Sequence, residues 1–202
     1  MRIAVKALIG LGVVIVLLST GYWIGNKNAE SIAELPIAEL PNCHPPFGDL
    51  APDGNVFVVL TPDKMAVTIS PLNSDKNPWE IKLTRPASDI IAISNETILV
   101  SYGTTGEVSL LNIVGDQPEQ TIKVGNFAGG MCRSATSQAF ISDPVSGKVY
   151  QFEPSSKSVI HAYSVKGEPT HMKWRVPDTE LEVFGDNKES LGILNVTSNA
   201  QG

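Results

Sequence analysis

Six charged or titratable residues stand at or near the starts of short apolar stretches in this 202-residue chain. They are Asp49, Asp89, Arg133, His171, Lys173 and Arg175. Carboxylates pair with guanidinium, ammonium and imidazolium groups, and a cluster of such groups can also hold an anion or a small acid. If the fold brings these six residues together, they would form a binding site for such a ligand. The simpler interpretation, which we favour, is that they are solvated or paired with one another.

The two cysteines, Cys43 and Cys132, could form a disulfide in an oxidising compartment. Both a bridge and two separate thiols stay open at this point. No C-x-x-C-H segment occurs, so covalent haem is not indicated. A metal site from Cys43, His44 and His171 would require distant segments to meet, and the histidines lack the H-x-H or H-x-x-x-H spacing of metal ligands. We therefore predict no metal and no cofactor.

Familiar catalytic motifs are missing from the sequence. It contains no P-loop, no G-x-S-x-G turn and no recognisable pair of catalytic carboxylates. We accordingly predict no catalytic residues. The formal net charge is −6, and acidic and basic residues are interspersed rather than gathered in a basic patch. This pattern argues against nucleic acid as a partner.

The elements that would position these residues recur with a period near 41. Val67, Val108, Val149 and Leu191 are separated by 41, 41 and 42 residues, each within an apolar segment of similar pattern. Each period holds four short stretches of alternating apolar and polar residues, with Gly, Pro, Asp, Asn and Ser between them. A period of about 40 residues with four strands is typical of a β-propeller blade. The sequence thus predicts an all-β, propeller-like domain.

Three segments carry a resemblance to a known repeat: "APDGNVFVV" from Ala51, "IKVGN" from Ile122 and "SGKVYQF" from Ser146. They are similar to the YVTN-type β-propeller repeat, in the quinoprotein-dehydrogenase-like group of propellers. The resemblance runs from Pro45 to the end of the chain and implies the blade architecture. It also implies a possible link to quinone-dependent dehydrogenases. Members of this group usually have seven or eight blades.

Four repeats make up the predicted domain at residues 45–202, and they span residues 45–85, 86–126, 127–168 and 169–202. The fourth repeat stops after its third strand, and Ser31–Leu40 could supply the missing outer strand. A closed ring of four blades, an open arc and a pair of chains forming eight blades are all compatible with this pattern, and we favour the ring. Because first strands line a propeller's channel, the six polar residues would lie at its mouth. Aligning these strands places Asp49, Ile90, Met131 and Lys173 in one layer.

The N-terminal region predicts a membrane anchor. Arg2 and Lys6 lie in residues 1–6, and residues 7–26 carry no charge and are mostly apolar, which is long enough to cross a bilayer. The positive charges place the N-terminus in the cytoplasm and the main domain in the periplasm or outside the cell. Residues 27–44 would be a linker. A cleaved signal peptide is the alternative, and it also exports the domain.

Two classes of function follow from these features. The first, which we favour, is a non-catalytic scaffold that binds another envelope protein, or a second copy of itself, beside the membrane. The second, implied by the resemblance, is an accessory subunit or reduced relative of a quinoprotein-type dehydrogenase with a small ligand at the channel mouth. The sequence leaves open whether the chain is an enzyme, although it favours a non-enzyme.

Overall fold

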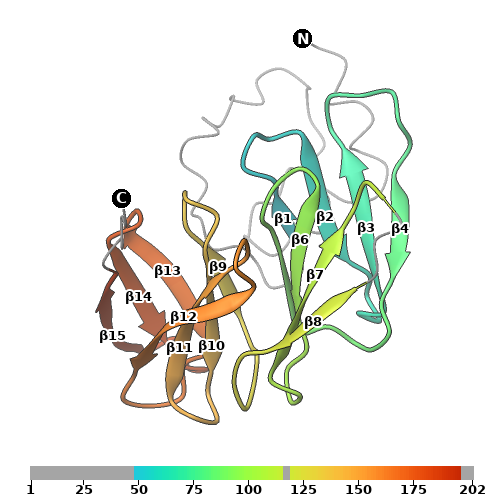
Figure 1. Cartoon of the computed structure of the whole chain (residues 1–202). Coiled ribbons are helices and arrows are strands. Elements are labelled where there is room, and N and C mark those ends of the chain that lie inside the picture. Colours follow the sequence, from blue (N-terminus) through green and yellow to red (C-terminus); the bar gives the residue numbers. More distant parts are fainter. Residues whose placement is uncertain (1–47, 116–118, 197–202) are drawn as a thin grey trace, which may run out of the picture. The chain divides into compact units, whose positions relative to one another are not determined.

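Four antiparallel sheets, which we call blades 1 to 4, make up the computed structural model over the residues it describes, 48–115 and 119–196 (Figure 1). Blade 1 contains β1 (Gly48–Leu50), β2 (Val56–Leu60), β3 (Ala66–Pro71) and β4 (Trp79–Lys82). Blade 2 contains β5 (Asp89–Ala92), β6 (Thr97–Ser101), β7 (Glu107–Asn112) and β8 (Gln120–Lys123). Blade 3 contains β9 (Met131–Arg133), β10 (Ala139–Asp143), β11 (Lys148–Glu153) and β12 (Ser158–Ser164). Blade 4 contains β13 (His171–Val176), β14 (Glu180–Phe184) and β15 (Ser190–Asn195).

The strands of each blade pair in sequence order and are joined by turns and longer loops. Several of these turns place a residue in the left-handed region of backbone conformation, namely Lys64, Ser137, Lys157, Asp178 and Lys188. Gly106, before β7, has a φ of 62°, and a side chain there would collide with the backbone of Gly125. The carbonyl of Gly106 accepts hydrogen bonds from the amides of Val124 and Gly125, so glycine lets the end of β8 close onto the β6–β7 turn.

The apolar core is divided among the spaces between neighbouring blades. Val58 and Ile69 of blade 1 pack against Ile98 and Val100 of blade 2, and similar clusters lie between blades 2 and 3 and between blades 3 and 4. Every residue of β5, β9 and β10 is buried, because blades 2 and 3 have a neighbour on each side. This arrangement confirms the predicted repeat, in which one blade buries its faces only against the next.

Blade 4 has a different outward face. The strand register places Glu182 of β14 at the position that Val58, Leu99 and Phe140 occupy in the other blades, where each is fully buried toward the next blade. Residues of β13 alternate between exposed and buried through Trp174, with the buried ones facing blade 3. A charged residue at an interface position is the pattern expected of a terminal repeat with a solvated outer side.

The described blades form an open row. Strands β1 and β2 pack on β5, β5 packs on β9, and β9 packs on β13. Within the described residues, no strand packing of comparable extent joins blade 4 to blade 1, and the two blades stand at opposite ends of the row in Figure 1. The closed ring of four that we favoured from the sequence therefore does not form among these strands. Closing it would place Glu182 where the other interfaces hold apolar side chains.

The layers of the first strands also differ from the prediction. Asp49 pairs with Val58, whereas Ile91 and Cys132 pair with the equivalent residues Leu99 and Phe140. Asp49 is thus level with Ile91 and Cys132, not with Ile90 and Met131. The reason is that the turn between the first two strands is one residue shorter in blades 2 and 3 than in blade 1.

Three sequence predictions fall on residues that the structure does not describe: the anchor at residues 7–26, the linker at residues 27–44 and the supply of a strand by Ser31–Leu40. None of the described segments is a helix that could cross a bilayer.

Candidate functional site

Two of the predicted site residues are buried aspartates that join neighbouring blades. The carboxylate of Asp49 accepts hydrogen bonds from the amide of Leu50 at 2.6 Å and from the amide of Ala92, in blade 2, at 2.7 Å. The carboxylate of Asp89 accepts from the amide of Ile90 at 2.8 Å and from Met131, in blade 3, at 2.6 Å. Both side chains are about 4% exposed. Each aspartate therefore ties the first strand of its own blade to the first strand of the next one.

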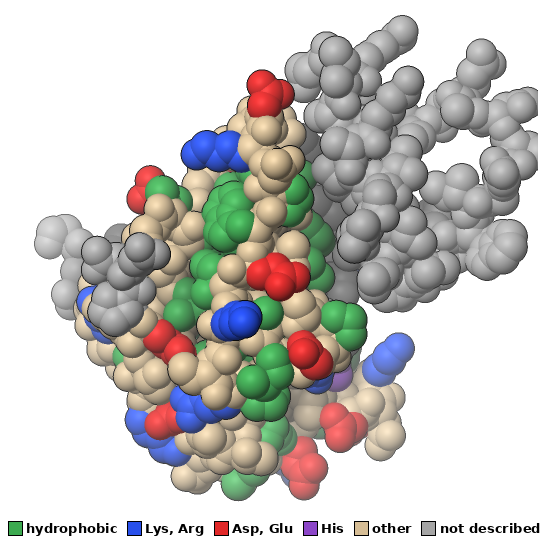
Figure 2. Space-filling model, turned by 90° about the vertical axis from the view of Figure 1, so that its right-hand side faces the viewer, with side chains coloured by type: hydrophobic (Ala, Val, Ile, Leu, Met, Phe, Trp, Pro, Cys, Tyr) green, Lys and Arg blue, Asp and Glu red, His purple; other side chains and the backbone are tan. Residues whose placement is uncertain are grey.

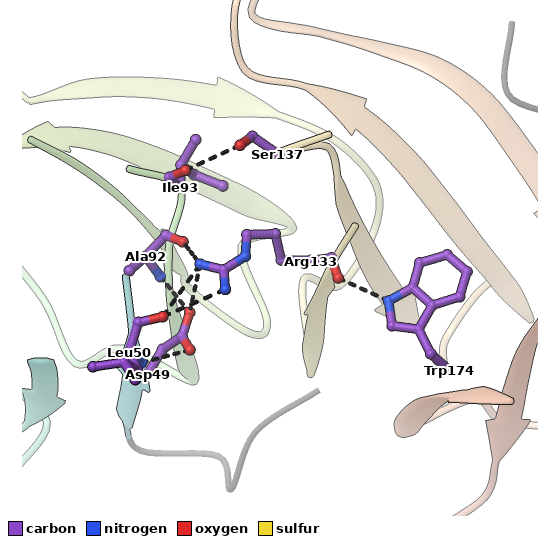
Figure 3. Close-up of polar contacts among 7 residues, drawn as sticks. All are labelled: Asp49, Leu50, Ala92, Ile93, Arg133, Ser137 and Trp174. Atoms are coloured by element: carbon purple, nitrogen blue, oxygen red, sulfur yellow. Dashed lines mark hydrogen bonds and ion pairs between the residues drawn. The ribbon is translucent and has the colours of Figure 1, made fainter. Parts of the chain in front are cut away.

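Arg133 extends this network from blade 3 back to blades 1 and 2 (Figure 3). Its guanidinium donates to the carbonyls of Ala92 and Leu50 and lies 3.4 Å from the Asp49 carboxylate. The backbone carbonyl of Arg133 in turn accepts a hydrogen bond of 2.7 Å from the indole Nε1 of Trp174 in blade 4. Because Arg133 is 9% exposed, its charge is held mainly by carbonyl groups and one carboxylate of its own chain.

Serines that the sequence analysis did not single out make a second set of links. The hydroxyl of Ser101 donates to the carbonyl of Gly129 at 2.9 Å, and the hydroxyl of Ser142 donates toward the carbonyl of Thr170 at 3.4 Å. Ser101 is the last residue of β6 and Ser142 is the last but one of β10, and both acceptors precede the first strand of the next blade. The signal was present in the sequence, because Ser101 and Ser142 occupy the same place in neighbouring repeats.

The remaining three predicted residues lie elsewhere. His171, Lys173 and Arg175 are exposed on β13, on the side of blade 4 that faces away from blade 3. Arg175 lies 3.8 Å from the carboxylate of Glu180. The structure thus brings Asp49 and Arg133 into contact and leaves the three cationic or titratable residues of blade 4 on a different surface. Binding of a small ligand by all six residues stays a prediction.

Cys132 is fully buried in the apolar cluster between blades 3 and 4. Its predicted partner, Cys43, lies outside the described residues, so this disulfide also stays a prediction. Among the residues that the structure describes, no group of three or more His, Cys, Asp or Glu side chains could hold a metal ion.

Two surface pockets lie between blades. One, of about 410 Å³, is lined by loops of blades 3 and 4 and includes Gly130, Ser142, Glu168 and Asp186. The other, of about 680 Å³, runs between the turns of blades 2 and 3. On the described part of the face shown in Figure 2, acidic and basic side chains are interspersed, as the sequence indicated. These surfaces can offer mixed polar contacts to a partner.

Two buried groups, Tyr102 and Asp143, have shifted pKa values that arise from contacts within the fold. Burial raises the pKa of Tyr102 well above its ordinary value, and the Glu119 carboxylate that accepts its hydroxyl adds to the shift. Burial by itself would raise the pKa of Asp143, but hydrogen bonds from Ser146 and from the amide of Asn126 hold it below the ordinary value. Both side chains therefore have structural roles, since their hydrogen-bond partners belong to neighbouring strands and loops.

Comparison with known proteins defines the fold class. No protein-family model matches this chain, and no curated protein shows significant similarity to it. Solved β-propellers match its structure. The β-propeller domain of Cps50 (Swd1) from Myceliophteria thermophila matches with a TM-score of 0.57 at 11% identity, over 69% of this chain and 48% of that one.

Two further solved structures give similar matches. Hydrazine synthase from Kuenenia stuttgartiensis has a TM-score of 0.55 at 14% identity, over 87% of this chain and 53% of that one. U3-55K has a TM-score of 0.51 at 10% identity, over 73% of this chain and 48% of that one. The chain therefore has a propeller-like fold and spans about half the length of these solved structures. At such low identity the likeness establishes the fold and leaves the function to other arguments.

Proposed function

We propose that this protein is a non-catalytic, protein-binding scaffold, anchored in a membrane by residues 7–26, whose blades bind another protein of the cell envelope. The observation that carries the proposal is the use of Asp49, Asp89 and Arg133 in links between blades. These inner-strand groups hold a rigid row of sheets together. The surfaces left for recognition are therefore the blade edges, the outward face of blade 4 and the grooves between turns.

The charge pattern supports a protein partner rather than a polyanion. The net charge is −6, and acidic and basic side chains are interspersed on the described part of the face shown in Figure 2. Mixed surfaces of this kind suit the polar rim of a protein interface, whereas nucleic acid requires a basic patch. The uncharged segment at residues 7–26 supports the membrane anchor.

Affinity capture from the protein's own membranes tests this proposal. The full chain would carry a C-terminal tag, be cross-linked in place and be extracted in mild detergent. The matched control is the same tag on residues 1–44, which keeps the anchor and linker but lacks the blades. We expect one or a few envelope proteins to be enriched with the full chain and absent from the control. Identical captures from both, or no captured protein, would overturn the scaffold function.

A separate fractionation tests the anchor. We expect the full-length chain to stay with the membrane through an alkaline carbonate wash, because a spanning helix resists extraction that removes peripheral proteins. A soluble chain that has lost its first 20 or so residues would instead establish the cleaved signal peptide.

A further inference from the structure

The pocket of about 410 Å³ between the loops of blades 3 and 4 has an acidic lining. Among the described residues that line it, Glu168 and Asp186 carry charge, and none is a lysine, arginine or histidine. Both side chains are exposed, and within residues 48–115 and 119–196 neither carboxylate takes part in a hydrogen bond or an ion pair. Two uncompensated negative charges at one hollow favour a cationic group.

The hydroxyl groups of the same pocket already use their hydrogens. Ser142 is fully buried, and its hydroxyl donates to the carbonyl of Gly130 at 3.1 Å and toward that of Thr170 at 3.4 Å. The hydroxyl of Thr170 lies 3.4 Å from the carbonyl of Phe184 and donates toward it. The side chains of the pocket therefore offer a ligand mainly oxygen atoms that accept, and the ligand must bring the donors, as an ammonium or guanidinium group does.

Glu168 takes a place that an aromatic side chain fills in the preceding repeat. The amides of Val124 and Val165 donate to the glycine carbonyls that precede β7 and β11, respectively, so the two links between blades begin alike. Three residues later, the first link has Phe127 and the second has Glu168. A β-carbon at Gly103 would lie 3.4 Å from the ring of Phe127, which shows that this ring covers the neighbouring turn of blade 2. Glu168 leaves a hollow and a charge instead.

Asp186 is likewise particular to blade 4, and an apolar wall faces it across the pocket. The amides ahead of β9 and β13 donate to the carbonyls of Ser142 and Phe184, respectively, and two residues after these acceptors stand Pro144 and Asp186. Pro144 and Val145 line the pocket from blade 3, and Val145 is 69% exposed. A long basic side chain can lay its methylene stem along such a wall while its charged end reaches a carboxylate.

The segments of this chain that the structure does not describe match the pocket poorly by charge. Residues 28–47 contain three glutamates and no lysine or arginine, residues 116–118 contain one aspartate, and residues 197–202 have no charged side chain. The three remaining basic residues outside the described ranges flank the predicted anchor at residues 7–26. Because like charges repel, the acidic segment that precedes blade 1 is not a suitable occupant, and a basic group of another protein is.

We propose that this pocket receives a lysine or arginine side chain of the partner protein. Its charged end donates hydrogen bonds to the carboxylates of Glu168 and Asp186, and its methylene stem packs on Pro144 and Val145. This inference rests on the proposed protein-binding function and names the chemistry of one contact and its place on the blades.

Neutral variants of the two carboxylates test the proposal. Glu168→Gln combined with Asp186→Asn keeps the size of both side chains, and both residues are exposed, so we expect the fold to be kept. The matched control is Glu96→Gln combined with Asp75→Asn, which changes the net charge equally at two exposed residues outside the pocket. The measurement is capture of the partner from membranes, quantified for the full-length variants.

We expect the double variant of the pocket to reduce capture of the partner by about tenfold or more, and the control variant to leave capture unchanged. Capture equal to that of the wild type would overturn the pocket as a contact and leave the scaffold function standing. Absence of a partner even for the wild type would instead overturn the proposed function itself.

A second pair of variants tests the apolar wall. Val145→Ser removes the exposed apolar surface beside the carboxylates, and Val114→Ser is its control, because Val114 is 65% exposed in the β7–β8 loop and does not line the pocket. We expect Val145→Ser to reduce capture by about fivefold and Val114→Ser to leave it unchanged. Unchanged capture by Val145→Ser would overturn the contact with the stem.

Labelling of carboxylates in the full-length wild type, with a carbodiimide and glycine ethyl ester, gives a test that needs no variant. We expect Glu168 and Asp186 to be labelled in the purified monomer and protected in the complex with the partner. Equal labelling of both residues in the two samples would overturn the proposal. Protection in the monomer would mean that a segment of the chain itself covers the pocket, and protection in a homodimer would mean that a second copy does; either result would also overturn it.

Discussion

Replacing Asp89 by alanine tests the links between blades most sharply. The carboxylate is about 4% exposed and accepts hydrogen bonds from the amides of Ile90 at 2.8 Å and Met131 at 2.6 Å. In Asp89→Ala both amides stay buried and lose this acceptor. A buried donor left without an acceptor costs about 1–3 kcal/mol, so we expect the free energy of unfolding to fall by about 2–5 kcal/mol.

Asp89→Asn provides an internal comparison at the same site. The amide side chain keeps one acceptor oxygen but loses the negative charge, and hydrogen bonds to a charged group are about twice as strong as neutral ones. Because the two Asp89 oxygens accept from different amides, the NH2 group of asparagine faces one of these donors, and we expect a loss close to that of Asp89→Ala. The control is Asp75→Ala, an exposed aspartate in the β3–β4 loop, which should leave the stability unchanged.

Denaturant unfolding of the full-length chain in detergent, followed by tryptophan fluorescence, measures these differences. Trp174 lies at the interface of blades 3 and 4 and reports on separation of the blades. A loss below about 1 kcal/mol for Asp89→Ala would refute the reasoning, because it would show that the aspartate does not carry the contact between blades 2 and 3.

Three further predictions concern single groups. Trp174→Phe keeps the edge-to-face contact with Phe140, at 5.2 Å between centroids, but removes the donor to the Arg133 carbonyl, so thermal and denaturant unfolding should show a loss of about 1–2 kcal/mol. Lys157→Gly should stabilise the protein by about 0.5–1 kcal/mol in the same assay, because Lys157 has a φ of 54° and glycine adopts this conformation without strain; a loss of stability would contradict this. The folded-state pKa of Asp143 lies below its ordinary value of 3.8, so its contribution is present above that pH and disappears as the pH falls through the folded-state value. The stability difference between the wild type and Asp143→Asn, measured from pH 7 to pH 2, should therefore shrink only at the acid end, and a difference independent of pH would contradict this.

The sequence predicts the blades well because their signal is periodic. Val67, Val108 and Val149 recur at equal spacing, and each is fully buried in the cluster toward the next blade. The third strands β3, β7, β11 and β15 each contain one of the four residues that define the predicted period, Val67, Val108, Val149 and Leu191. Local alternation and turn residues suffice for these elements, since each strand pairs with its neighbour in the chain.

The sequence gives little indication of whether the blades close into a ring, or of the hydrogen bonds that Asp49 and Arg133 make between blades. The turn after the first strand is one residue shorter in blades 2 and 3 than in blade 1, so Ile91 and Cys132 take the place in their blades that Asp49 takes in blade 1. An alignment of the repeats without gaps does not reveal this difference. The roles of Asp49 and Arg133 depend on backbone groups of other blades, which have no side-chain signature. The open row follows from the outward face of blade 4, where Glu182 replaces the apolar residue of the other repeats; a comparison of equivalent positions could have revealed it.

The mass of the native assembly tests the central claim most directly. The full-length chain, of 21.6 kDa, would be released from its own membranes in mild detergent and weighed intact by native mass spectrometry. The scaffold account predicts a larger assembly that contains a second, reproducible protein. A species of 21.6 kDa alone, after extraction that preserves other membrane complexes, would contradict it.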